Sequence, residues 1–388
     1  MNAKSRDLTA NALGSRAPRE KLSARTRLGT MGTAAVALLI GMVQASFAAP
    51  LLPVPISTSP SNGDLNPYGV LFVTDDLGGT LQRGDILVSN FNNSANVMFL
   101  GTTIVDIRKG AQTPTPFYTA TTAGEGLGLA LGQLKDFIII GNVPTIAGPT
   151  AGPGALTVLN SSGAVVNTLT DPAATFIDGP WGMAINQDPA GMADKTSGAQ
   201  IFVSNVLNGT VWRLDVSVSE SKGVTINDEV KVGSNYAFEL TFPTVVNGPA
   251  GLAYDAKHDT LYVASELDNE IFAITDASKI ATNQTTPGTV VYSDSAHLYG
   301  PTGLLLLGNG DLLTANDDGV NTNPAEPSEL VEFTPGAPTG TFVTQLSIDP
   351  ANGGAFAIGL VRNRAQTVLG YVDDNEATLS ILSLFTGF

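Results

Sequence analysis

Asparagine and acidic side chains end a series of short apolar segments, and these residues have the clearest chemistry to offer. Residues 85–90 end in Asn90, and a similar segment at residues 200–205 ends in Asn205. The complete set is Asn90, Asn142, Asn205, Glu266, Asn316 and Asp373. Carboxylate and amide oxygens are the ligands that a hard cation such as Ca²⁺ prefers. Polar side chains of this kind, placed beside aromatic residues, also suit a carbohydrate or another polar small molecule.

Further candidates stand at the head of other apolar segments. These are Tyr68, Glu125, Trp181 and Thr302. Tyr68 and Trp181 would add aromatic platforms beside the amides. Turn chemistry is the alternative for the asparagines, because Asn and Asp side chains hydrogen-bond to their own backbone in turns. Glu266 and Asp373 break the asparagine pattern with a charge, so a functional role has more support at these two positions than at the asparagines.

The composition excludes several kinds of chemistry. The 388 residues contain no cysteine, which removes disulfides, thiolate metal sites and cysteine nucleophiles. With only two histidines, a three-histidine zinc site cannot be built. The formal net charge of −16 makes the chain a poor partner for nucleic acid. Hydrophobic residues make up 43% of the chain, which is enough apolar material for a large core.

Residues 1–48 have the order of regions that is typical of a secretory signal peptide. Residues 1–30 hold seven basic and two acidic side chains, and an apolar stretch at residues 31–43 follows. This stretch is shorter than the roughly 20 residues that a membrane helix needs. We predict cleavage after Ala48, with an uncleaved N-terminal anchor as the alternative. The mature chain is then a secreted or periplasmic protein without a membrane span.

One pattern recurs six times along the rest of the chain: a turn, a Pro-x-Gly sequence or a relative of it, and an apolar strand. The aligned glycines are Gly69, Gly128, Gly182, Gly251, Gly303 and Gly359. A second strand follows each copy and ends in one of the asparagine or acidic residues above. Six units of three or four strands predict an all-β fold, a single six-bladed β-propeller over residues 49–388.

The propeller brings the candidate residues together. The end of each second strand and the start of each first strand lie on one face, so the side chains would surround the mouth of the central channel. The last unit lacks a clear outer strand. We expect residues 51–57 to supply it and close the ring, as an edge strand because Pro53 and Pro55 cannot donate backbone hydrogen bonds.

The repeat resembles the NHL-repeat propellers and the related gluconolactonase/senescence-marker propellers. The likeness lies in the Pro-x-Gly-Leu-Ala strand at residues 249–253 and the Leu-Tyr-Val-Ala strand at residues 261–264, and it covers roughly residues 60–385. These families include enzymes, scaffolds and uncharacterised secreted proteins. Their second strands usually end in Asp, whereas this chain mostly has Asn.

The Gly-Glu-Gly sequence around Glu125 looks like the one that carries a metal-binding Glu in the gluconolactonase-like group, although Leu127 stands where that group usually has proline. The resemblance implies Ca²⁺ as a cofactor. Its ligands would be Glu125 with Asn142, Asn205 or Glu266, and Asp373 is a further acidic candidate.

Two functions follow from this reading. The first is an exported binding or scaffold module whose channel face binds a polar small molecule, a carbohydrate or a protein. The alternative is a Ca²⁺-dependent hydrolase of the lactonase type, in which the cation would polarise a lactone carbonyl or activate water. A lyase or oxidoreductase using zinc or a quinone is a third class, but the histidine count argues against zinc and no residue marks a quinone site.

Overall fold

The regular structure consists of strands, which form where short β-branched and aliphatic segments alternate with Gly, Asn and Asp turns. The computed structural model describes residues 53–121, 126–146, 150–189, 198–241, 245–316, 328–363 and 366–384. These residues contain 28 strands and no helix. The predicted signal peptide lies outside the described residues.

Three four-stranded antiparallel sheets form the first half of the ring. Blade 1 consists of β2 (Leu65–Phe72), β3 (Ile86–Asn92), β4 (Thr103–Ile107) and β5 (Thr115–Thr119). Blade 2 consists of β6 (Leu127–Leu134), β7 (Phe137–Asn142), β10 (Ala155–Leu159) and β11 (Val165–Thr170). Blade 3 consists of β12 (Pro180–Asn186), β13 (Gly198–Asn205), β14 (Thr210–Ser219) and β15 (Gly223–Ser234).

Three similar sheets form the second half. Blade 4 consists of β18 (Pro249–Asp255), β19 (Thr260–Ser265), β20 (Glu270–Thr275) and β21 (Thr289–Tyr292). Blade 5 consists of β22 (Pro301–Leu306), β23 (Leu312–Asn316), β24 (Glu329–Thr334) and β25 (Thr341–Ser347). Blade 6 consists of β26 (Ala355–Asn363), β27 (Gln366–Asp373), β28 (Thr378–Leu384) and β1 (Ile56–Ser57).

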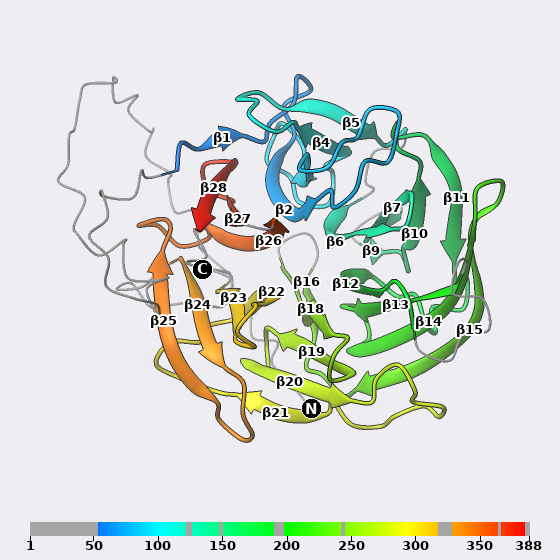
Figure 1. Cartoon of the computed structure of the whole chain (residues 1–388), viewed down its shortest axis with the longest axis vertical. Coiled ribbons are helices and arrows are strands. Elements are labelled where there is room, and N and C mark those ends of the chain that lie inside the picture. The colour runs from blue at the N-terminus through cyan, green and yellow to red at the C-terminus, as the bar shows by residue number, and fades with distance from the viewer. Residues whose placement is uncertain are drawn as a thin grey trace, which may run out of the picture. The chain divides into compact units, whose positions relative to one another are not determined.

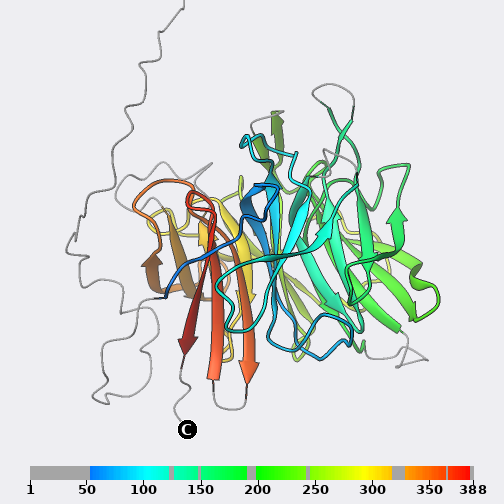
Figure 2. The ribbon, with the colours of Figure 1, turned by 90° about the horizontal axis from the view of Figure 1, so that it is seen from above.

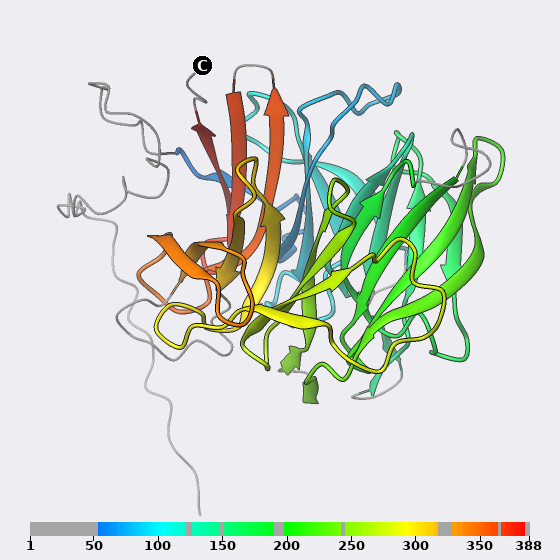
Figure 3. The same ribbon diagram turned by 60° about the horizontal axis from the view of Figure 1, so that its bottom comes forward.

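The six blades close into a ring (Figure 1). The innermost strands contact one another in the order β2, β6, β12, β18, β22, β26 and back to β2. Separate apolar clusters fill the interfaces between neighbouring blades, which stand side by side around the ring in Figure 3. The predicted all-β, six-bladed propeller is confirmed.

The N-terminal strand closes the ring, as the sequence predicts. Ile56 pairs with Leu379 and Ser57 with Thr378, so β1 is the outermost strand of blade 6. The backbone N–H and the hydroxyl of Thr58 both donate to the carbonyl of Ala377, at 2.9 Å each. Ile56 is buried in the cluster that also holds Leu379. The first and last described strands therefore belong to one sheet.

The recurrent glycines allow neighbouring blades to approach closely at the axis. A Cβ atom on Gly182 would overlap the carbonyl oxygen of Ala250 in the next blade. A Cβ on Gly251 would likewise overlap the carbonyl oxygen of Thr302. The pairing of first and second strands shifts register at this position, for example between Pro180 and Gly182. The Pro-x-Gly motif is thus a β-bulge at the point where the innermost strands converge.

Two short hairpins are inserted between the blade strands. One is formed by β8 (Thr145–Ile146) and β9 (Thr150–Ala151), and the other by β16 (Glu239–Thr241) and β17 (Val245–Asn247). The first follows a second strand and the second precedes a first strand, so both belong to the face where second strands end. We call this the upper face. The hairpins project from this face in Figure 2.

Candidate functional site

The register of the blades brings the predicted site residues to the upper face. Asn90 pairs with Pro67, Asn142 with Leu127, and Asn205 with Pro180, so each lies beside the start of the innermost strand of its blade. Asn316 and Asp373 occupy the same position in blades 5 and 6. The strand ends thus share one edge of the ring, as the repeat implies.

Blade 4 departs from this pattern by one residue. Ser265 pairs with Pro249 and occupies the position that asparagine holds in other blades, so Glu266 comes one step later. The alignment of Glu266 with the asparagines is therefore wrong by one residue. Even so, the Glu266 carboxylate accepts a hydrogen bond from the backbone N–H of Gly248, which immediately precedes β18, at 3.1 Å.

Two of the asparagines hold the loops that lead into the innermost strands. The Oδ1 atom of Asn205 accepts from the backbone N–H of Asp178 at 3.1 Å, and its Nδ2 donates to the carbonyl of Phe176 at 3.2 Å. Asn316 repeats this arrangement, accepting from the N–H of Tyr299 at 3.1 Å and donating to the carbonyl of His297 at 2.8 Å. Both side chains are completely buried. Their amide groups are engaged by the protein itself.

Asn90 and Asn142 make comparable backbone contacts. The Nδ2 of Asn90 donates to the carbonyl of Thr58 at 3.0 Å, which ties blade 1 to the segment that closes the ring. The Oδ1 of Asn142 accepts from the N–H of Ala155 at 2.8 Å. These contacts join residues 32 and 13 positions apart in the chain. They therefore hold separate segments together and differ from the local turn hydrogen bonds that the sequence offered as the alternative to ligand binding.

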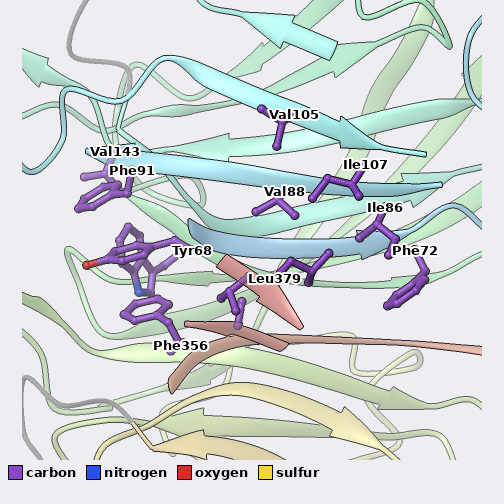
Figure 4. Packing of buried hydrophobic residues seen from close by; sticks show 14 of the residues in the cluster. Tyr68, Phe72, Ile86, Val88, Phe91, Val105, Ile107, Val143, Phe356 and Leu379 are labelled. Carbon is purple, nitrogen blue, oxygen red and sulfur yellow. The ribbon is translucent and has the colours of Figure 1, made fainter. Parts of the chain in front are cut away.

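Tyr68 and Trp181 are packed at the axis of the ring and do not form exposed aromatic platforms. Tyr68 stacks on Phe356 with ring centroids 3.7 Å apart and on Phe91 at 4.6 Å. Trp181 meets Phe91 edge to face at 5.3 Å. Tyr68 is 6% exposed and Trp181 is fully buried. We call Tyr68, Phe91, Trp181 and Phe356 the axial plug. Figure 4 shows Tyr68, Phe91 and Phe356 close together.

Glu266 lies against this plug and is 1% exposed. Burial raises the pKa of its carboxyl to about 8, although the N–H groups of Gly248 and Trp181 act in the opposite direction. Its Oε1 atom and the indole Nε1 of Trp181 have no partner with hydrogen-bond geometry. The indole is close enough to lower the pKa but not aligned for a hydrogen bond. The carboxyl is therefore protonated at neutral pH.

Asp373 belongs to a different environment in blade 6. It is half-buried, and its carboxylate accepts a weak hydrogen bond from the backbone N–H of Glu376 at 3.3 Å. Burial, followed by the negative charge of Asp349, raises its pKa to about 6. The contact with Glu376 is that of a residue organising the turn between β27 and β28.

The two acidic calcium candidates that the structure describes lie in different blades. Glu266 follows β19 of blade 4, whereas Asp373 ends β27 of blade 6. Within the described part of the chain, no group of three or more acidic, histidine or cysteine side chains could hold a metal ion. Glu125, the ligand suggested by the resemblance, lies outside the described residues, and its role stays a prediction.

The sequence did not reveal Phe91 and Phe356 as members of the plug. Phe356 was missed because Gly359 was aligned with Gly69. The pairing of Ala355 with Asp373 corresponds to that of Pro67 with Asn90, so Phe356 is the equivalent of Tyr68. An alignment of the sixth unit on its second strand, instead of on its glycine, would have found it.

Comparison with known proteins bears on the fold alone. No family model matches the sequence, and no curated protein matches it. The solved α-L-arabinanase of Penicillium chrysogenum, complexed with arabinobiose, is 14% identical, with 87% of this chain and 99% of that chain covered and a TM-score of 0.51. A calcium-binding regucalcin from Agrobacterium tumefaciens is 10% identical, with 88% of this chain and 98% of that chain covered and a TM-score of 0.48. A putative gluconolactonase is 11% identical, with 87% of this chain and 96% of that chain covered and a TM-score of 0.45.

Proposed function

We propose that this chain is an exported binding propeller whose upper face receives a polar ligand or a protein partner. One observation carries the proposal: each of the four strand-end asparagines bonds to the backbone of the protein itself, whereas two inserted hairpins rise from the same face. Phe238, directly before β16, is 49% exposed, and Leu240 within β16 is 37% exposed. Such a face offers a raised contact surface over a closed channel mouth. A catalytic pocket would instead need polar groups that are free to reach a substrate.

The charge of the chain restricts the partner. Removal of residues 1–48 would leave 12 basic and 33 acidic side chains, a net charge of −21. Long-range repulsion would slow the approach of an acidic partner. A neutral carbohydrate, another neutral polar molecule, or a protein with a neutral or basic surface is therefore favoured.

Photo-crosslinking and carbohydrate arrays test this proposal. A benzophenone amino acid placed at Phe238 should crosslink a protein partner, whereas the same group at Val343 in β25 should not. Val343 is a matched control because it is also apolar and is 44% exposed. For carbohydrate partners, the mature protein should be retained on an array of neutral oligosaccharides, and Phe238→Ser should reduce retention. The absence of both a crosslink and retention on the array would contradict the proposal.

The Ca²⁺-dependent lactonase is the second candidate, and one observation favours it. The buried Oε1 of Glu266 lacks a hydrogen-bond partner, and a cation would have to displace the proton of this carboxyl in order to bind. The melting temperature of the mature protein should not change between millimolar calcium and a chelator if the binding proposal holds. A calcium-dependent rise that Glu266→Gln abolishes, together with lactone hydrolysis, would favour the enzyme.

Export is also proposed, on the basis of the charged, apolar and small-residue regions at the N-terminus. In the described part of the chain, no helix has the length and apolarity needed to cross a membrane. The intact mass of the exported product should correspond to a chain that begins at Ala49. A product that retains residues 1–48 in the membrane fraction would indicate an uncleaved anchor instead.

A further inference from the structure

The innermost strands of all six blades line a partly open cavity of about 230 Å³ on the axis. Each blade contributes apolar side chains to its wall. In blade order from 1 to 6, the apolar lining residues include Val70, Leu129, Met183, Leu252, Leu304 and Ile358. Val70, Met183 and Ile358 follow the plug residues Tyr68, Trp181 and Phe356 by two positions in their strands, which is a step of roughly 7 Å along each strand. The cavity therefore begins directly behind the axial plug.

Among the described residues that line the wall, none has a charged side chain. Thr74 is the one described lining residue with a polar side chain, and its hydroxyl already donates to Asp75 at 2.9 Å and lies 3.1 Å from the Oε1 of Gln133. A charged ligand would lose its hydration in this cavity without an ionic partner to replace it. The side chains therefore select against ions.

The backbone gives the cavity a substantial polar character. Each innermost strand is the terminal strand of its sheet, so it is hydrogen-bonded to a neighbour along one edge only. The other edge faces the axis and presents N–H and C=O groups of the main chain. These groups can bind a hydroxyl or carbonyl of a neutral molecule. The cavity thus suits an uncharged ligand that combines an apolar body with a neutral polar group.

The size of the cavity restricts the ligand further. Benzene fills an apolar cavity of roughly 150 Å³, and drug-sized ligands occupy pockets of roughly 300–1,000 Å³. Val70, Leu129 and Met183 are only partly buried although they lie at the centre of the ring. A ligand on the axis would remove their remaining apolar surface from water, which is favourable.

We infer that the axial cavity is a binding site for a small, uncharged molecule with an apolar body and a neutral polar group, of the size of a medium-chain alcohol. This site is separate from the proposed upper-face surface, because the axial plug lies between them. The ligand enters from the opposite face, where Thr74 follows β2. Its occupation fills the ring from within and contacts all six blades.

A pair of matched ligands tests the inference on the mature wild-type protein. Octan-1-ol and octanoate share a chain length and differ in charge at pH 8. Calorimetric titration should show one saturable site for octan-1-ol, with binding of octanoate weaker by at least about tenfold. Octan-1-ol should also raise the melting temperature. Equal affinity for both ligands, several weak sites, or no saturable binding of octan-1-ol would overturn the inference.

Substitution of Met183 tests the location. Met183→Lys would place an ammonium group in the wall, so octan-1-ol should bind about tenfold more weakly and octanoate should gain affinity. Met183→Leu keeps an apolar wall and should bind octan-1-ol as the wild type does. If Met183→Lys does not fold, a crystal of the wild type grown with 8-bromooctan-1-ol decides the matter. Bromine density between the innermost strands supports the site. Bromine density found only outside this cavity rejects it.

Discussion

Trp181 and Phe356 meet edge to face with ring centroids 6.4 Å apart and an interplanar angle of 87°, although their strands belong to blades 3 and 6. These blades lie opposite each other in a ring of six. Their side chains can meet only across the axis, and Tyr68 of blade 1 stacks on the same phenyl ring. The axial plug therefore joins blades that are not neighbours, in addition to closing the channel.

Removal of the indole should destabilise the whole ring. Trp181→Ala deletes a fully buried side chain that touches Tyr68, Phe91 and Phe356. We expect the free energy of unfolding to fall by about 3–5 kcal/mol in denaturant titrations. Trp181→Phe keeps an aromatic ring at the axis and should cost less. A loss below about 0.5 kcal/mol for Trp181→Ala would contradict the role of the plug.

The stability of the protein should fall as pH rises from 6 to 8. The pKa of Glu266 is raised from its ordinary value of 4.5 to about 8 in the folded protein, so the folded state retains a proton that the unfolded state releases. The stabilisation is complete below about pH 4.5 and is lost progressively up to about pH 8, at no more than about 1.4 kcal/mol per pH unit. Asp106 and Asp373 act in the same direction, but their pKa values of about 6 confine them to lower pH.

Glu266→Gln is the matched variant for this pH dependence. The neutral amide cannot release a proton, so chemical denaturation at pH 6, 7 and 8 should show less decline than in the wild type. Trp181→Phe should extend the decline to higher pH, because the indole N–H lowers the pKa of Glu266 in the folded protein. An identical pH profile for wild type and Glu266→Gln would show that this carboxyl does not titrate in the window.

Loss of the closing strand should weaken blade 6. Ile56 is 5% exposed and packs in the cluster that contains Leu379, so Ile56→Ala should lower the free energy of unfolding by about 2 kcal/mol. Val54 lies two residues earlier and is 70% exposed, which makes Val54→Ala a suitable control. Equal effects of the two substitutions in thermal unfolding would show that β1 does not secure the ring.

Asn205 should behave as a structural residue. Asn205→Ala leaves the N–H of Asp178 and the carbonyl of Phe176 without this partner, at a cost of about 1–3 kcal/mol. The exposed Asn227 of β15 provides the control, and Asn227→Ala should change stability by less than about 0.5 kcal/mol. A stable Asn205→Ala protein that loses ligand binding would instead restore the ligand-binding interpretation.

The blade order followed from the sequence because the Pro-x-Gly motif marks a geometric requirement. Gly182 must lack a side chain where it meets Ala250, and Gly251 must lack one where it meets Thr302. The closing strand could be predicted as well, since the sixth unit has too few strands of its own. These features depend on spacing along the chain, which a single sequence displays.

The site was less predictable because its contacts cross the ring. No local pattern distinguishes an aromatic residue at an open rim from one packed against the opposite blade, as Trp181 is against Phe356. The one-residue offset between Ser265 and Glu266 likewise depends on strand register, which the repeat does not specify. An asparagine that binds a ligand and one that holds a loop give the same sequence pattern. Only the hydrogen-bond partners in the structure distinguish the two roles.

The pairing of Ile56 with Leu379 also sets an order of events during synthesis. Of the blade strands, β1 is made first, and its partner β28 is made after all the others. Until then the outer edge of blade 6 does not exist, and residues 56–57 have no sheet to join. Ring closure must therefore be a late step of folding. A chain interrupted in its last blade would keep two open ends, each able to pair with another copy.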